Sequence, residues 1–175
     1  MSDSRIEGYA RGLFEIARAE GTIDEVEDEL FRFARLYESN EEMRNALSDE
    51  QIPAGKRQSI VEDLLGGKVT PTTTQLISMV VGSGRARDLP AIVDKLVARA
   101  SSAKNLEVAE VRTAIALTPD QETRLAAALA NATGKEVNLK VVVDPSVWGG
   151  IVATVGDTVI DGTVRSRIEQ LKSRL

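Results

Sequence analysis

Apolar side chains recur every three to four positions throughout the first 105 residues of the chain. This spacing places them along one side of an α-helix, so it predicts a run of amphipathic helices rather than strands. Helix-breaking or capping residues interrupt the pattern at Gly21, Ser39, Pro53, Gly66 and Gly82. Six helices joined by such short turns predict an antiparallel bundle over residues 1–105.

Local signals predict how several of these helices begin and which side they bury. Thr22 with Glu25, and Ser39 with Glu42, have the spacing of capping boxes. The helix that follows Pro53 is predicted to bury one side, made up of Ile60, Val61, Leu64 and Leu65.

Two apolar stripes run along the first helix. The first has the spacing of a bundle-core stripe and comprises Ile6, Ala10, Leu13, Phe14 and Ala17. The second, adjacent stripe comprises Tyr9, Gly12, Leu13 and Ile16. A helix in a small bundle needs about one apolar stripe, so the second requires either further cover within the bundle or another polypeptide. Periodicity alone leaves both interpretations open.

Beyond the polar segment 101–105, the pattern changes to short apolar runs separated by turn residues. We expect a domain junction there, between residues 1–105 and residues 106–175. The second part predicts the order β-α-β-β-β-α, so the fold class is α+β: a six-helix antiparallel bundle followed by a small α+β domain. Its first helix, Thr118–Gly134, begins with a capping box and is long enough for a crossover that makes the flanking strands parallel.

The last helix carries apolar residues at 4-3-4 spacing, after a predicted N-cap at Asp161. These residues are Val164, Ile168, Leu171 and Leu175. They either cover the small sheet or bind another polypeptide, and the spacing does not choose between the two.

Composition narrows the class of protein. The chain has 42% apolar residues, enough for a core, but only 3% aromatic residues and neither cysteine nor histidine. Disulfides, cysteine metal sites and histidine general bases are therefore excluded. Residues 1–50 carry 14 acidic and 6 basic side chains, a net charge of −8, which argues against nucleic acid as a partner. We expect no signal peptide and no membrane span, since no stretch approaches ~18 apolar residues.

The candidate chemical motifs favour structure over catalysis. Gly67-Lys68 lacks the remaining residues of a phosphate loop, and Gly82 and Gly84 lack the third glycine of a dinucleotide loop. A small nucleotide- or anion-binding module that uses these glycine turns remains the alternative function. The acidic cluster at residues 24–29 is typical of a solvated helix start. Asp144, Asp157 and Asp161 lie in turn or cap contexts.

The motif DPSxxGG, followed by an apolar run and GDxVIDGTVRxRIxxL, resembles the delta subunit of F-type ATP synthases, called the oligomycin-sensitivity-conferring protein in mitochondria. The match runs through Asp144, Gly149, Gly150, Gly156, Asp157, Ile160, Asp161, Gly162, Val164 and Arg165. Weaker similarities lie at Tyr9, Ala10, Leu13, Phe14, Ala17, Leu76, Ile77, Gly84, Arg85, Leu89 and Pro90.

This resemblance implies a non-catalytic stator subunit without a cofactor, a monomer when isolated, present in one copy per complex. The subunit would be peripheral, on the cytoplasmic face of the energy-transducing membrane. Residues 1–105 would bind the N-terminal helix of an alpha subunit, and residues 106–175 the C-terminal region of b-type stalk subunits. The predicted head-side contacts are Tyr9, Gly12, Leu13 and Ile16, facing Met79, Val80 and Ser83. The predicted stalk-side contacts are Val164, Arg165, Ile168 and Leu171.

Overall fold

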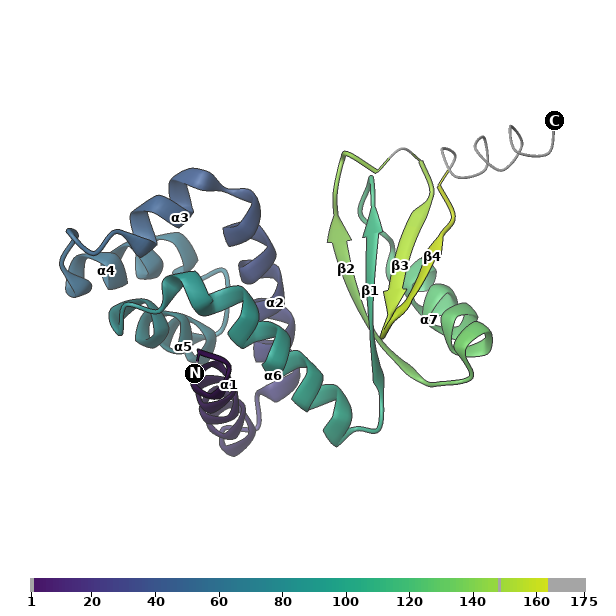
Figure 1. Cartoon of the computed structure of the whole chain (residues 1–175), viewed down its shortest axis with the longest axis horizontal. Coiled ribbons are helices and arrows are strands. Elements are labelled where there is room, and N and C mark those ends of the chain that lie inside the picture. Colours follow the sequence, from purple (N-terminus) through teal and green to yellow (C-terminus); the bar gives the residue numbers. More distant parts are fainter. Residues whose placement is uncertain (1, 148, 164–175) are drawn as a thin grey trace. The chain divides into compact units, whose positions relative to one another are not determined.

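The computed structural model describes residues 2–147 and 149–163, and contacts between Cα atoms divide the chain into two compact units. The first unit is Met1–Ala100 and the second is Ser101–Leu175 (Figure 1). The first is helical and the second combines a helix with a sheet. The predicted α+β class is therefore confirmed.

Helices account for all the regular structure described in the first unit. They are α1 (Ser2–Ala19), α2 (Ile23–Ser39), α3 (Glu41–Ser48), α4 (Ala54–Leu65), α5 (Pro71–Gly82), the short 3₁₀ helix η1 (Ala86–Asp88) and α6 (Leu89–Ala103). Their apolar sides form one aliphatic core, whose fully buried large side chains include Leu13, Leu30, Leu47, Ile77 and Leu96. The core is dominated by aliphatic side chains, in line with the low aromatic content.

Two of the predicted capping boxes are wrong. Thr22 precedes α2 with φ −115° and ψ 20°, outside the extended conformation of a capping residue, and its hydroxyl has no hydrogen-bond partner. At α3 the cap is Asn40, whose Oδ1 accepts from the amide of Met43 at 2.9 Å. Ser39 instead ends α2 and donates to the carbonyl of Leu36. Asparagine caps a helix at least as well as serine, so α3 is not destabilised when its cap is Asn40 in place of Ser39.

The buried side of α4 also differs from the prediction. Val61 and Leu65 are buried as expected, but Leu64 is 41% exposed. The buried positions follow a strict four-residue spacing that begins at Arg57, so the core stripe is narrower than the sequence suggests.

A carboxylate from α2 caps the start of α5. Glu29 accepts hydrogen bonds from the amide of Thr70 at 3.0 Å, from the Thr70 hydroxyl at 2.8 Å and from the Thr73 hydroxyl at 2.5 Å. Thr73 is fully buried. One member of the acidic cluster at residues 24–29 therefore ties two helices together.

Replacing Glu29 with Ala will lower the free energy of unfolding of the first unit by about 1–3 kcal/mol, because the Thr70 amide and the buried Thr73 hydroxyl lose their acceptor. Urea denaturation followed by circular dichroism measures the effect. Glu25→Ala, an exposed carboxylate on the same helix, is the control and will change stability by about 0.5 kcal/mol or less. Equal effects of the two substitutions would contradict this capping role.

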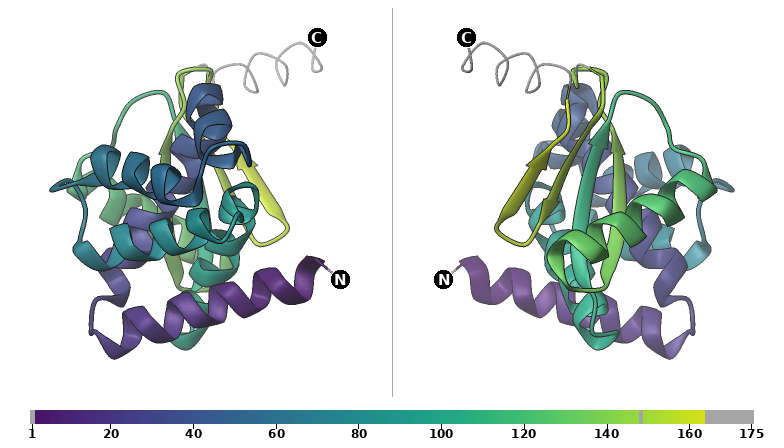
Figure 2. Two further views of the ribbon diagram at one scale, coloured as in Figure 1. Left: turned by 90° about the vertical axis from the view of Figure 1, so that its left-hand side faces the viewer. Right: turned by 90° about the vertical axis from the view of Figure 1, so that its right-hand side faces the viewer.

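The second unit is a four-stranded mixed sheet with a helix on one face (Figures 1 and 2). Its elements are β1 (Glu107–Thr113), α7 (Pro119–Thr133), β2 (Val137–Val143), β3 (Ile151–Val155) and β4 (Thr158–Asp161). The strand order is β2-β1-β3-β4. β1 and β2 pair in parallel, as the crossover predicted, whereas β3 and β4 join in antiparallel fashion.

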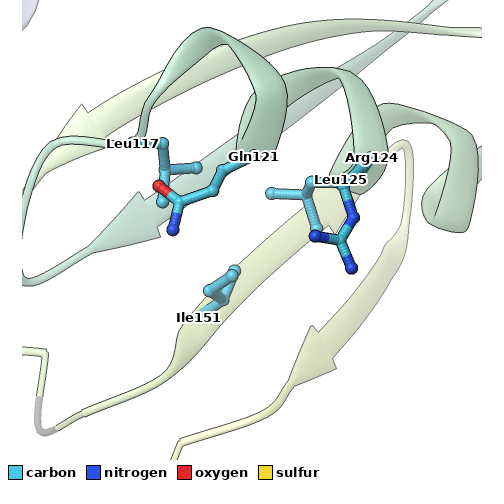
Figure 3. Close-up of a pocket in the computed structure, with 5 residues that line it drawn as sticks. All are labelled: Leu117, Gln121, Arg124, Leu125 and Ile151. Carbon is cyan, nitrogen blue, oxygen red and sulfur yellow. The ribbon is translucent and has the colours of Figure 1, made fainter.

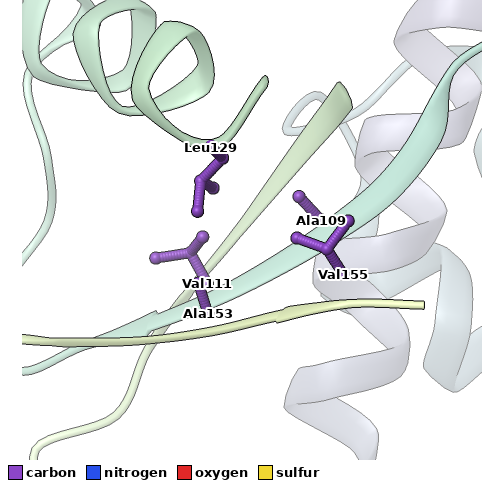
Figure 4. Packing of buried hydrophobic residues seen from close by; sticks show 5 residues of the cluster. All are labelled: Ala109, Val111, Leu129, Ala153 and Val155. Carbon is purple, nitrogen blue, oxygen red and sulfur yellow. The ribbon is translucent and has the colours of Figure 1, made fainter. Parts of the chain in front are cut away.

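The crossover helix begins and ends as its sequence predicts. The amide of Gln121 donates to the Thr118 hydroxyl, and the amide of Thr118 donates to Gln121 Oε1 at 2.9 Å. Gly134 ends the helix with φ +72°. Leu129 of α7 then packs on a small core from β1 and β3, formed by Ala109, Val111, Ala153 and Val155 (Figure 4).

Candidate protein-binding site

Helices α1 and α5 lie side by side and run in opposite directions. Close to the middle of α1, the hydroxyl of Tyr9 donates to Ser83 Oγ, just after α5, at 3.3 Å. Just beyond the end of α1, the carboxylate of Glu20 accepts from the hydroxyl of Thr72, in the first turn of α5. These contacts lie at opposite ends of α5 and pair it with the second half of α1 in antiparallel orientation. The residues between the two contacts therefore share one surface.

The shared surface carries exposed apolar side chains from both helices. Ile16 is 39% exposed and Met79 is 43% exposed, although both are large apolar residues. Tyr9 is half-buried, and Gly12 and Ser83 are exposed. We call this set, Tyr9, Gly12, Ile16, Met79 and Ser83, the α1/α5 strip.

Two of the predicted contact residues lie below the strip. Leu13 is 1% exposed and Val80 is fully buried, so both belong to the core of the first unit. The prediction that they contact a partner needs correction, because the packing between α1 and α5 buries their side chains. The side chains of Leu13 and Val80 pack in the core beneath the strip.

Gly12 leaves space at the middle of the strip. A Cβ atom added there would meet no atom within 4 Å outside its own helix. The internal packing therefore does not require glycine at this position. The gap is free for another molecule to approach the backbone of α1.

The bundle covers the second stripe of α1 only in part, because Leu13 is buried whereas Ile16 is 39% exposed. Exposed apolar side chains that gather on one surface are typical of protein-binding sites. The strip is the candidate site of the first unit.

A second candidate surface lies in the second unit and was missed by the sequence analysis. A pocket of about 290 Å³ opens between the first turns of α7 and the start of β3 (Figure 3). It is lined by Leu117, Gln121, Arg124, Leu125 and Ile151. The sequence signal for it is the four-residue spacing of Leu125 and Leu129 in the crossover helix. The predicted stalk-side residues Val164, Arg165, Ile168 and Leu171 lie outside the described residues.

The glycine turns use their amides to close helices. The amide of Gly84 donates to the carbonyl of Val81, and that of Arg85 donates to the carbonyl of Val80, each at 3.0 Å. At the end of α4, the amide of Gly66 donates to the carbonyl of Glu62 at 2.8 Å. A phosphate-binding loop needs such amides pointing at the ligand. These turns therefore lack the geometry of the alternative nucleotide-binding module.

The aspartates of the second unit are likewise engaged in turns. Asp144 accepts from the hydroxyl of Ser146 at 2.6 Å and from its amide at 2.9 Å. These bonds, helped by the charge of Arg112, hold the pKa of Asp144 below its usual value. Asp161 accepts from the amide of Thr163 at 2.9 Å. Both carboxylates thus stabilise local backbone.

Among residues 2–147 and 149–163, no three side chains of the metal-binding types gather closely enough to hold an ion. No helix in the described part of the chain is long and apolar enough to cross a lipid bilayer. The exposed strip is typical of a protein-binding surface, and the glycine turns use their amides to close helices.

The family profile described as ATP synthase delta (OSCP) subunit matches residues 6–175. The chain therefore belongs to the ATP synthase delta (OSCP) subunit family.

Individual relatives agree with this assignment. The chain is 43% identical over 175 residues to ATP synthase subunit delta of Nocardia farcinica, covering all of this chain and 65% of that protein. It is 41% identical over 159 residues to the subunit of Streptomyces avermitilis, covering 91% of this chain and 58% of that one. The chain thus spans about three-fifths of the length of these two relatives. For Desulforudis audaxviator the identity is 33% over 167 residues, with 95% and 92% covered.

A solved structure shares the fold. A chain of the Toxoplasma gondii mitochondrial ATP synthase hexamer matches with a TM-score of 0.56 and 20% identity, covering 97% of this chain and 96% of that one. At that identity the match supports the arrangement of helices and strands.

Proposed function

We propose that this chain is the stator subunit that links the catalytic head of an F-type proton-translocating ATP synthase to its membrane-anchored b subunits. It holds the head still, so that torque from the proton-driven rotor is used for ATP synthesis. Family membership supports the role, and the observation that carries the proposal is the α1/α5 strip.

In this proposal helices α1–α6 act as an antiparallel bundle, and the strip receives the N-terminal helix of one alpha subunit. An amphipathic helix buries its apolar side chains in such a surface at three- and four-residue spacing. Ile16 and Met79 supply apolar contact, Gly12 allows close approach, and the Tyr9–Ser83 pair supplies polar groups at one end.

A stator joint must not slip under load, which requires high affinity. A nanomolar dissociation constant corresponds to about 12 kcal/mol at 25 °C. Interfaces of up to about 800 Å² on each partner reach such affinities when a few apolar residues are fully desolvated. The strip offers Ile16 and Met79 for this purpose.

The second unit, by the same proposal, joins the C-terminal region of the b-type subunits. Residues 101–175 carry 9 acidic and 9 basic side chains, so the second unit has no net charge, whereas residues 1–50 carry a net charge of −8. Arg165 and Arg167 then meet acidic residues of the stalk. One copy of the chain, a monomer before assembly, serves each complex on the cytoplasmic face of the membrane.

Reconstitution tests the proposed function. ATP synthase stripped of its own delta subunit will regain proton-driven ATP synthesis when the full chain is added, while ATP hydrolysis by the detached head stays unchanged. The isolated chain should neither hydrolyse ATP nor bind it at micromolar concentration. Failure to restore synthesis, or tight binding of ATP by the isolated chain, would favour the nucleotide-binding alternative.

A further inference from the structure

The first turn of helix α4 (Figure 1) carries two positively charged side chains, Lys56 and Arg57, and no negatively charged one. The start of a helix is the positive end of its dipole, so cations are disfavoured there unless an anion lies nearby. The residue that precedes the helix, Pro53, makes no side-chain hydrogen bond to it. The neighbouring sequence therefore leaves the positive charge of this helix start without compensation.

The guanidinium group of Arg57 is buried without a partner. Arg57 is only 6% exposed, and its Nε atom is enclosed and has no hydrogen-bond acceptor. No carboxylate of the described residues forms an ion pair with it. Of the two acidic residues before the helix, Asp49 accepts from the amide of Gln51 at 2.9 Å, and Glu50 is exposed. A buried cation without an anion is strongly destabilising, so Arg57 indicates an anion supplied from outside the described chain.

Two backbone amides at the same helix start are also free. The amides of Lys56 and Arg57 donate to the carbonyl of Pro53 at 2.9 Å and 3.1 Å. The amides of Ala54 and Gly55 have no acceptor within the part of the chain that the structure describes, and both residues are exposed. A Cβ atom on Gly55 would meet nothing within 4 Å beyond the adjoining chain, so the space beside these amides is open.

The arginine and the free amides lie at one end of α4. The Cα–Cβ bonds of a helix tilt toward its N-terminus, so a long side chain in the first turn extends toward that end. The rise from Ala54 to Arg57 is about 4.5 Å, a length that an arginine side chain spans.

The later turns of α5 pack beside this helix start and contribute a further unused polar group. Gln58 Nε2 donates to the carbonyl of Ser78 at 3.2 Å, which places Ser78 next to the first turns of α4. The hydroxyl of Ser78 is enclosed and has no partner among the described residues. The start of α4 therefore combines two cations and two free amides with a neighbouring hydroxyl that can donate.

We propose that the first turn of α4 binds a tetrahedral oxyanion of the phosphate type. Its donors are the guanidinium of Arg57, the ammonium of Lys56 and the free amides of Ala54 and Gly55. Helix N-termini bind such oxygens through their amides, and arginine binds them through parallel hydrogen bonds. Two positive charges and donors from several directions match a doubly charged anion with four oxygens better than a carboxylate with two.

None of these donors belongs to the α1/α5 strip, and the inference does not require the proposed stator function. Phosphate binding and restoration of ATP synthesis are separate measurements, so either proposal can fail alone.

Titration of the isotope-labelled full chain with inorganic phosphate tests the site, with sodium chloride holding the ionic strength constant. We expect the amide NMR signals of Ala54 and Gly55 and the Nε–H signal of Arg57 to shift saturably, with one common dissociation constant in the millimolar range. Sulfate, which has the same shape, should compete with phosphate, and acetate should bind at least tenfold more weakly.

Two results of this titration would overturn the proposal. Shifts that grow without saturation would show that only water and salt meet these groups. Acetate that binds as tightly as phosphate would indicate a carboxylate of a partner protein in place of a tetrahedral anion.

Replacing Arg57 with Gln removes the charge and keeps a polar side chain. It should weaken phosphate binding at least tenfold, because hydrogen bonds to charged groups are the stronger ones. Arg11→Gln is the matched control, since Arg11 is an exposed arginine on α1 of the same unit, and it should leave the affinity within twofold. Equal weakening by both substitutions would show that phosphate responds to the overall charge of the unit, against the proposal.

A second variant covers the case in which Arg57→Gln does not fold. Lys56 is exposed, so Lys56→Gln leaves the packing of the unit intact. It should weaken phosphate binding about threefold, as expected for one exposed charge. An affinity that Lys56→Gln leaves unchanged would overturn the proposed donor set.

Discussion

Replacing Ile16 with Glu will weaken binding of the alpha-subunit N-terminal helix by at least about 100-fold. Burial of the exposed two-fifths of Ile16 contributes about 0.6–1.2 kcal/mol, and desolvation of the new, unpaired carboxylate costs several kcal/mol more. Together these exceed the 2.7 kcal/mol or so that corresponds to 100-fold. Because Ile16 is 39% exposed, the fold itself should change in stability by about 0.5 kcal/mol or less.

Calorimetric titration of the full chain with a synthetic peptide of that helix measures the loss. Leu36→Glu is the matched control, since Leu36 is also a large apolar residue, 53% exposed, on α2 of the same unit but outside the α1/α5 strip. The control should bind the peptide with unchanged affinity. Equal weakening by both substitutions would indicate a general effect of charge, and unchanged binding by Ile16→Glu would remove the strip from the interface.

Replacing Gly150 with Ala will destabilise the second unit by at least about 4 kcal/mol. Gly150 has φ +92°, a conformation that a residue with a Cβ atom adopts only with strain. The added Cβ would also lie 2.5 Å from the carbonyl oxygen of Gly162 and 3.0 Å from the Cα of Thr163. Both are backbone atoms, so relief requires the chain beyond β4 to move.

The Gly134→Ala variant separates the effect of backbone strain from the effect of a steric clash. Gly134 has φ +72°, but a Cβ atom there would meet nothing within 4 Å. This control should therefore cost only about 1–2 kcal/mol. Hydrogen exchange at the amides of β1 and β3 measures both variants, and protection in the first unit should stay unchanged. A cost for Gly150→Ala no larger than that for Gly134→Ala would show that the two segments are not in close contact.

Features set by local sequence were the ones that could be predicted. The capping box at Thr118, the helix end at Gly134 and the parallel pairing across this crossover all follow from signals within a few residues or from connection length. At Thr22 and Ser39 the same reasoning failed. Thr22 does not adopt the extended backbone conformation of a capping residue. At the start of α3 the capping residue is Asn40 and not Ser39.

Whether a given side chain is buried or exposed was harder to predict than where the helices lie along the chain. Periodicity singled out the stripe that holds Tyr9, Gly12 and Ile16, and the structure leaves these residues accessible. It also included Leu13, which lies in the core, because a residue between two stripes belongs to whichever side a neighbouring helix covers. Burial of this kind depends on tertiary packing.

The pocket of the second unit had almost no sequence signal. Leu117 and Leu125 come from the crossover, whereas Ile151 lies on β3, and pairing of β1 with β3 brings them together. The pairing of a crossover strand with a later hairpin is a long-range choice that local patterns do not contain.

Footprinting of the strip within the assembled synthase tests the central claim most directly. Met79→Cys places a unique thiol on the strip, and Leu64→Cys places one on α4, at residues that are 43% and 41% exposed respectively. Cysteine is shorter than methionine, so it leaves the surface open to a partner. We predict that assembly will slow modification of the Met79→Cys thiol at least tenfold and leave the Leu64→Cys thiol as reactive as in the free chain. A thiol at position 79 that reacts equally fast in the complex and in the free chain would contradict the account, because the strip would then hold no partner.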